Sequence, residues 1–187
     1  MLKHPVYIHF FCLVWFLNGL IACTTNRPIQ PPTNWPYEKE AIKLHIKAAD
    51  HLNFYEGQPH PVVFCIYQMR QPSLFQDLIR ERQGLYRLIE GRIYDPDIVK
   101  YKQISIKPSQ QGILSIDREE AAQYIGIVVG YYFLSSETCT RIFTIPVIVE
   151  RRALIRKTET SKVSPCLLNI ELGPQAILQL NIQAHKE

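Results

Sequence analysis

Short runs in which apolar and polar residues alternate limit this chain to an all-β architecture. From Ala41 to Ala49 every second residue is apolar, and the residues between are mostly lysine or histidine. Successive side chains of a strand point to opposite faces, so this period of two predicts a half-buried strand. Similar runs, each ended by turn-forming residues, predict strands at 62–69, 99–106, 113–116, 124–134, 141–149, 167–172 and 176–182. Strands of this length and spacing indicate an antiparallel β-sandwich of about eight strands.

Three segments add detail to this sandwich. Residues 124–134 are apolar on both faces, which predicts a central strand. Residues 72–88 carry apolar residues near helical spacing, interrupted by Gly84, and predict a short helical excursion. Residues 151–164 are rich in charged and hydroxyl side chains, and we expect a polar connection there.

The β region is preceded by an apolar run from Val6 to Ala22 that ends at a cysteine. A basic start followed by such a run is typical of a secretory signal. The stretch Leu20-Ile21-Ala22-Cys23 resembles the bacterial lipobox, in which a small residue precedes a cysteine whose thiol accepts diacylglycerol. We therefore expect residues 1–22 to be a lipoprotein signal peptide and Cys23 to carry a covalent lipid. The alternative is a transmembrane anchor, since the run approaches the length needed to cross a bilayer.

Residues 23–40 follow as the lipidated cysteine and a Pro-rich linker, and 41–187 form the expected β-sandwich domain. Prolines favour an extended, semi-rigid chain, so the linker should lift the domain off the membrane. Thr24 stands where an Asp would resemble an inner-membrane retention signal, which favours the outer membrane. Trp35 and Tyr37 either pack on the domain or lie at the lipid interface.

Composition and motifs argue against an enzyme or a nucleic-acid-binding protein. The formal net charge is +4 and the basic residues are scattered, whereas nucleic-acid binding needs a basic stripe. The sequence has no Gly-rich phosphate loop, no Gly-x-Ser-x-Gly and no Cys-x-x-Cys motif. Asp50, His51 and His60 match no metal-ligand spacing, and we interpret the histidines as solvated loop residues. We expect no catalysis, no small-molecule substrate, no metal and no cofactor other than the lipid.

Three cysteines remain after Cys23. Cys65 lies in a predicted strand, where a buried free thiol is the simplest interpretation. Cys139 lies at a predicted turn and Cys166 just before a strand, so a disulfide between them is possible in an oxidising compartment. The sequence does not show whether their Cα atoms approach closely enough to form it.

A set of short motifs follows the lipobox in a fixed order between residues 41 and 149. They are Leu52-Asn53, Gly57, Pro59, Pro61-Val62-Val63, Ile66-Tyr67-Gln68-Met69, Phe75, Pro108 and Tyr124–Tyr131. This order resembles the outer-membrane lipoprotein family of type VI secretion systems, the TssJ/VasD/SciN family. The chain departs from that pattern at Met69, where Leu is usual, at Ser109, where Gly is usual, and at Thr140 to Pro146, which lacks a frequent Trp.

The resemblance implies a transthyretin-like antiparallel β-sandwich with a small helical insertion, held at the outer membrane and facing the periplasm. It also implies a function: anchoring a trans-envelope secretion complex by binding the periplasmic domain of a TssM/IcmF-like inner-membrane protein. In the family, the loop joining the first two strands makes that contact, and here it is residues 50–60. The expected partner-binding residues are Leu52, Asn53, Phe54, Tyr55, Glu56, Gly57 and Gln58.

Two alternatives remain open on the sequence alone. Leu52 and Phe54 either contact the partner or fold back onto the edge of the sandwich. The chain as a whole is either this anchor or a periplasm-facing lipoprotein that binds a small ligand or a cell-wall fragment.

Overall fold

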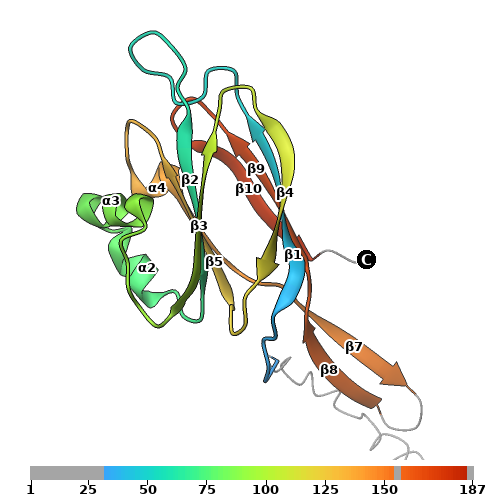
Figure 1. Cartoon of the computed structure of the whole chain (residues 1–187). Helices are drawn as coiled ribbons and strands as arrows, with labels where there is room; N and C mark the ends of the chain where they lie inside the picture. The colour runs from blue at the N-terminus through green and yellow to red at the C-terminus, as the bar shows by residue number, and fades with distance from the viewer. Residues whose placement is uncertain (1–31, 154–156, 185–187) are drawn as a thin grey trace, which may run out of the picture.

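Two four-stranded sheets packed face to face form the body of the protein (Figure 1). The structure is a computed structural model and describes residues 32–153 and 157–184. The predicted signal peptide and Cys23 lie outside the described residues. The first sheet has the strand order β10-β9-β1-β4 and the second has the order β3-β2-β5-β6, while β7 and β8 pair only with each other.

The described strands and helices alternate irregularly along the chain. The strands are β1 Glu38–Ala48, β2 Val62–Met69, β3 Ile98–Ile106, β4 Gln111–Arg118, β5 Tyr124–Gly130, β6 Thr140–Thr144, β7 Val147–Ala153, β8 Lys157–Val163, β9 Cys166–Leu172 and β10 Ile177–Ala184. The helices are α2 Ser73–Leu78, α3 Arg82–Glu90 and α4 Ser136–Cys139. Among the described residues, none of these helices has the length and hydropathy to cross a bilayer.

The predicted all-β sandwich is confirmed, with ten strands instead of eight. The run predicted as one strand at 141–149 is two strands, β6 and β7, which Ile145 and Pro146 separate. Proline has no amide hydrogen for a strand ladder, so it favours a break at this point. The predicted polar connection at 151–164 is wrong, because β7 and β8 form a two-stranded ribbon there. Its sequence lacks the alternating apolar face by which the other strands were found.

Strand β1 is the centre of the first sheet. It pairs antiparallel with β4 along one edge and parallel with β9 along the other. This parallel pair departs from the expected purely antiparallel sandwich. Parallel neighbours need a long crossover connection, and the strands of the second sheet provide it between β1 and β9. Because β1 is hydrogen-bonded on both sides from Ile42 to Lys47, its position relative to the sandwich is fixed over that part of the strand.

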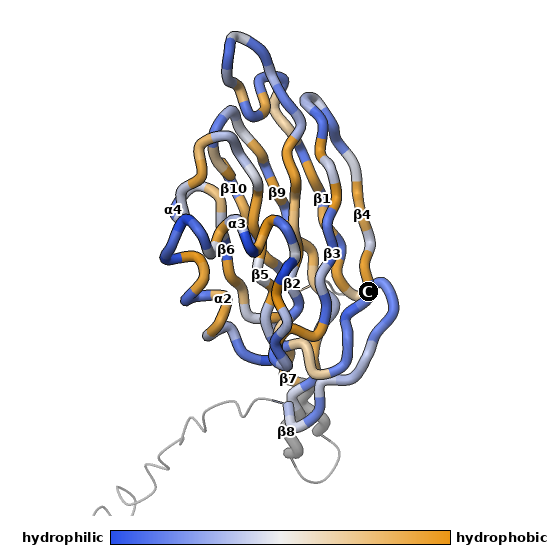
Figure 2. Tube along the Cα trace, turned by 60° about the vertical axis from the view of Figure 1, so that its left-hand side comes forward, coloured by the Kyte–Doolittle hydropathy of each residue, from blue (hydrophilic) through white to orange (hydrophobic). Residues whose placement is uncertain are grey.

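The core lies between the two sheets, and it is made by the inward residues of the alternating runs. On β1 these are Ile42, Leu44 and Ile46, each at most 5% exposed. Side chains from β2 and β5 face them across the sandwich, and those of β9 lie beside them in the same sheet. The alternation of apolar tube segments along these strands is visible in Figure 2. The burial of this many large aliphatic side chains is the main source of stability for such a fold.

A second, smaller apolar cluster lies on the outer face of the second sheet, which α2 and α3 cover (Figures 1 and 2). It joins Tyr67 of β2 to Phe75 of α2 and Leu88 of α3. Strand β2 is therefore buried on both faces, which explains its nearly continuous apolar sequence. A Cβ atom on Gly126 of β5 would lie 2.6 Å from the Phe75 ring, so a glycine there allows α2 to approach the sheet closely.

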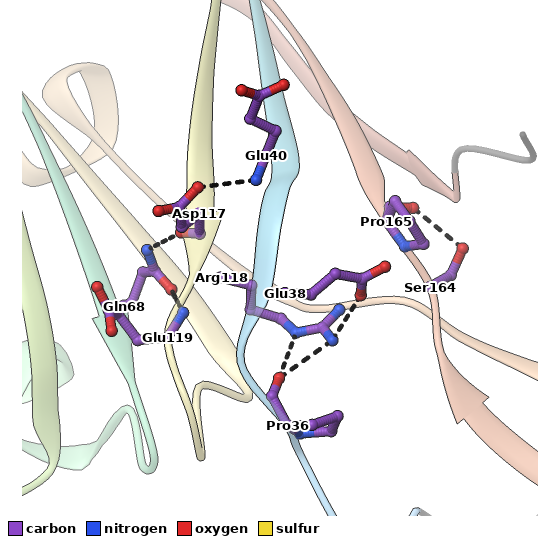
Figure 3. A network of polar contacts seen from close by, with 9 residues as sticks. All are labelled: Pro36, Glu38, Glu40, Gln68, Asp117, Arg118, Glu119, Ser164 and Pro165. Carbon is purple, nitrogen blue, oxygen red and sulfur yellow. Dashed lines mark hydrogen bonds and ion pairs between the residues drawn. The ribbon is translucent and has the colours of Figure 1, made fainter.

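A polar network fixes the point where the N-terminal segment meets the sandwich (Figure 3). Arg118 of β4 is only 1% exposed, and its guanidinium donates to the carbonyl oxygen of Pro36 and pairs with Glu38 at 2.7 Å. Trp35 is 9% exposed, and its carbonyl oxygen accepts a hydrogen bond from the Ala121 amide. Of the two interpretations of Trp35, packing on the domain is therefore the one observed.

Asp117, the neighbour of Arg118, extends this network on the solvent side. Its carboxylate accepts hydrogen bonds from the Tyr37 hydroxyl at 2.7 Å and from the Glu40 amide at 2.8 Å. These two hydrogen bonds lower the pKa of Asp117. The buried side chain of Gln68 on β2 then joins the two sheets, since it donates to the Asp117 carbonyl and accepts from the Glu119 amide. Residues 35–40 are thus held by side chains of the sandwich itself.

The Arg118 contacts can be tested by their effect on stability. Arg118→Ala leaves the Pro36 carbonyl without its donor and Glu38 without its counter-ion. We expect the free energy of unfolding to fall by about 2 kcal/mol, because the Pro36 carbonyl loses its charged donor, whereas the 37% exposed Glu38 side chain can be solvated. Urea unfolding followed by the fluorescence of Trp35, which packs in the core beside this network, measures the change.

Lys47→Ala is the matched control, because it breaks an ion pair with Glu171 whose side chains are 63% and 37% exposed. Exposed pairs of this kind contribute less than about 1 kcal/mol. If Arg118→Ala costs no more than Lys47→Ala, the network does not hold the N-terminal segment in place.

Candidate functional site

The connection between β1 and β2 lies at one end of the sandwich, and the described N-terminal segment meets the sandwich at the other (Figure 1). The connection leaves β1 after Ala48 and rejoins the sheet at Val62. Its first residues are tied to the neighbouring turns: the Ala49 amide donates to the Leu172 carbonyl, and the Ser109 hydroxyl donates to Asp50 at 2.7 Å. The predicted partner-binding loop is therefore an ordered extension of the sandwich.

The first two predicted contact residues are buried. Leu52 is 0% exposed, and its carbonyl oxygen accepts a hydrogen bond from the His60 amide. Asn53 is 7% exposed and has a left-handed backbone, which asparagine tolerates better than most residues. Leu52 therefore folds back into the core, the second of its two predicted positions. Neither side chain can present a surface to a partner, which corrects that part of the predicted contact set.

Asn53 instead joins two connections that are distant in sequence. Its side-chain oxygen accepts a hydrogen bond from the Tyr132 amide at 2.8 Å, and its side-chain nitrogen donates to the Pro61 carbonyl at 3.3 Å. Tyr132 belongs to the connection between β5 and α4. The β1–β2 connection and the β5–α4 connection are thus held together by a buried amide with both of its polar groups used.

The tip of the β1–β2 connection is a tight turn. Tyr55 and Gln58 exchange both backbone hydrogen bonds, at 3.2 and 3.1 Å. Between them Glu56 and Gly57 both have positive φ, the backbone of the mirror-image turns that close two-residue hairpins. Glu56, Gly57 and Gln58 are exposed, whereas Tyr55 is half-buried. These three exposed residues form the surface that the turn presents to solvent.

Aromatic rings support this turn from below. The Tyr55 ring lies between the rings of His60 and Tyr132, with centroid distances of 3.7 and 4.2 Å and nearly parallel planes. Phe54 is half-buried, its ring lies 5.4 Å from that of His51, and its amide donates to the Pro174 carbonyl. The loop therefore has a rigid aromatic base and a small polar tip. Tyr55 acts chiefly within the protein, because both faces of its ring are covered.

Two residues of this end were not found from the sequence. Tyr132 is 57% exposed and Phe133 is 53% exposed, and their rings meet edge to face at 5.0 Å. The apolar run at 124–134 was predicted as one strand, but β5 ends at Gly130. The three consecutive aromatic residues directly after that glycine, Tyr131 to Phe133, could have indicated an exposed aromatic segment. Tyr131 itself is buried, and its hydroxyl donates to the Ala176 carbonyl.

The three cysteines of the described body are free and buried. The possible disulfide between Cys139 and Cys166 is therefore not formed; Cys139 ends α4, and Cys166 begins β9 in the other sheet. Burial raises the pKa of Cys166 to about 12 and that of Cys65 to about 11, so both remain protonated at neutral pH. Thiols of this kind are inert compared with catalytic cysteines.

The described residues offer little to a metal or a small ligand. No group of three His, Cys, Asp or Glu residues among them could hold a metal ion. Two surface hollows of about 200 and 270 Å³ lie at β3–β4 and on the outer face of the first sheet. Both are lined largely by lysine, glutamate, glutamine and asparagine side chains, and both are smaller than typical ligand pockets.

Comparison with solved structures finds proteins of the same fold. TssJ1, a type VI secretion lipoprotein from Pseudomonas aeruginosa, is 20% identical with a TM-score of 0.56, covering 84% of this chain and 99% of that one. Lip from Serratia marcescens, a membrane-bound component of the type VI secretion system, is 18% identical with a TM-score of 0.52, covering 78% and 97%. A chain of a type VI membrane complex is 16% identical with a TM-score of 0.52, also covering 78% and 97%.

A comparison with curated proteins gave no match. A comparison with protein families is more specific. Residues 40–160, which are more than half of the chain, match the family T6SS-SciN, described as type VI secretion lipoprotein, VasD, EvfM, TssJ. That family is a structural component of the secretion machinery, not known as an enzyme and with no known cofactor. The expected resemblance is thus confirmed, and the chain belongs to the type VI secretion lipoprotein family.

Proposed function

We infer that this protein is anchored in the outer membrane by a lipid on Cys23 and binds the periplasmic domain of a TssM/IcmF-like inner-membrane protein. In this way it holds the outer-membrane end of a trans-envelope secretion complex. Family membership makes a lipid-anchored component of the machinery the natural starting point. The occurrence of a similar fold in a type VI membrane complex supports the same role.

The observation that carries the proposal is the placement of the β1–β2 turn. Its exposed tip, Glu56 to Gln58, lies at the end of the sandwich away from the N-terminal segment (Figure 1). A lipid on Cys23 would hold the N-terminal end at the membrane, so the tip would face the periplasm. The aromatic base keeps the tip in one conformation, which lowers the entropy cost of binding.

The alternative function, capture of a small ligand or a cell-wall fragment, has less support. The two surface hollows are small, at about 200 and 270 Å³, whereas ligand pockets usually enclose about 300 Å³ or more. For a protein partner, the turn offers an exposed tip held in one conformation, which lowers the cost of binding.

The lipid anchor is tested by Cys23→Ser in the full-length chain. Without the thiol no thioether to diacylglycerol can form, so the variant should incorporate no labelled palmitate and should leave the outer-membrane fraction. Labelling in cells and separation of the membranes on a density gradient measure both properties. Cys12→Ser, a change within the predicted signal peptide, is the control and should keep both. Labelling that persists in Cys23→Ser would show that the lipid is attached elsewhere and would overturn the proposed anchor.

The loop is tested by the double variant Glu56→Ala with Gln58→Ala, which removes two exposed side chains and leaves the Tyr55 ring stack and the turn backbone unchanged. We expect the Kd for the purified periplasmic domain of the partner to rise about tenfold or more, equivalent to about 1.4 kcal/mol. The lipidated chain in detergent and the partner domain in a calorimeter provide the measurement.

The matched control is Glu120→Ala with Gln183→Ala, an exposed Glu and Gln at the opposite end of the sandwich. This control should bind as tightly as the unaltered protein. Equal affinities for the loop variant and the unaltered protein would place the partner interface away from the turn.

A further inference from the structure

We propose that Tyr132 and Phe133, in the β5–α4 connection, form the apolar centre of the partner-binding surface, with the β1–β2 turn as its polar margin. This inference rests on the proposed function and adds to it a second segment of the interface. It commits to one occupant, the periplasmic domain of the inner-membrane partner.

The exposure of the two rings is the first argument. Phe133 is 53% exposed and Tyr132 is 57% exposed. The two residues are adjacent in sequence and their rings are in contact, so they form one exposed aromatic pair. Among the described residues, other exposed aromatic side chains, such as Tyr86 on α3 and Tyr94 before β3, make no ring contact with a second exposed aromatic residue. Single exposed apolar residues are common on protein surfaces, whereas contiguous ones mark interaction sites.

The second argument is that the rings are held in place before any partner arrives. The Tyr132 amide is hydrogen-bonded to Asn53, and its ring stacks on Tyr55 at 4.2 Å. The Phe133 carbonyl contacts the buried Cys139 thiol at 3.7 Å, and Tyr131 on the other side is anchored by its hydroxyl. Rigid aromatic side chains lose little conformational entropy on binding and are frequent among interface hot spots.

The ring geometry indicates what the partner must offer. The planes of Tyr132 and Phe133 are inclined at 85°, so together they form a right-angled projection. One face of Tyr132 is covered by Tyr55 and Phe133 contacts the ring as well, yet Tyr132 remains 57% exposed. A complementary surface is an apolar groove that receives both rings, with a polar group for the Tyr132 hydroxyl and a basic group facing the exposed carboxylate of Glu56.

Continuity with the turn identifies the occupant. The stack His60, Tyr55, Tyr132 and the perpendicular Phe133 form one unbroken series of ring contacts from the β1–β2 connection to the β5–α4 connection. A partner that covers the exposed tip at Glu56 to Gln58 therefore meets Tyr132 next. Interfaces commonly have an aromatic centre surrounded by polar residues, and these two segments together have that composition.

The test is Phe133→Ala in the full lipidated chain, measured against the partner's purified periplasmic domain. We expect the Kd to rise at least tenfold, while the melting temperature falls by no more than about 3 °C because the ring is half-exposed. Tyr86→Ala is the matched control, since it removes an aromatic ring of 43% exposure from α3 and should not change the Kd. Phe133→Ser gives a second variant, in case alanine alters the fold of the connection.

A photo-cross-linking amino acid in place of Tyr132 gives an independent readout. It should form a covalent adduct with the partner domain on irradiation, whereas the same amino acid at Tyr86 should not. The loop variant Glu56→Ala with Gln58→Ala separates the two hypotheses. If that variant weakens binding while the Phe133 variants bind normally and position 132 gives no adduct, this inference is overturned and the proposed function stands. If none of these variants weakens binding, both fail.

Discussion

Strand β1 is the constraint on which the rest of the structure depends. It lies in the middle of its sheet, hydrogen-bonded to β4 along one edge and to β9 along the other. Its 11 residues extend over about 35 Å, from the N-terminal segment at one end to the proposed partner surface at the other. A strand paired on both edges cannot bend or slip without breaking two ladders. The two ends of the molecule are therefore fixed relative to each other.

Each end of β1 is secured in a different way. At the N-terminal end, Arg118 and Asp117 hold residues 36–40 by charge-assisted hydrogen bonds, which are directional and stronger than neutral ones. At the other end, Asn53 and the stacked rings hold two connections together. Neither arrangement positions a nucleophile or a general base. Arg118, Asp117 and Asn53 all keep backbone segments in place.

The sequence predicted the sheets well because their alternation is a direct consequence of burial. Strand β2 was found with its exact bounds, 62–69, and β5 was correctly predicted to be central. Strand β8 was missed and β7 was predicted only as far as Val149. The ribbon packs on the core at Val147 and Val163, and the charged and hydroxyl residues between them give no period-two apolar signal. The parallel pairing of β1 with β9 was also missed, since nothing in the local sequence of either strand specifies its neighbour.

The proposed site was harder to predict, because its residues come from separate parts of the chain. The β1–β2 loop was located by resemblance, but the sequence could not show that Leu52 is buried or that Asn53 binds the Tyr132 amide across 79 positions. Tyr132 was predicted to lie in a strand, but β5 ends at Gly130. A Tyr or Phe in the sequence can be exposed or buried, and only the fold shows which.

The dimensions of the chain limit where a partner could be met. Eleven residues lie between Cys23 and Trp35, and fully extended they span at most about 40 Å. With a lipid on Cys23, residues 35–38 add about 10 Å and β1 adds about 35 Å, so Ala48, at the base of the β1–β2 loop, would lie no more than about 85 Å from the membrane. A partner fixed in the inner membrane must extend a periplasmic domain to within that reach. In the proposed role, the extended linker and the rigid sandwich together set the greatest distance from the membrane at which the partner can be bound.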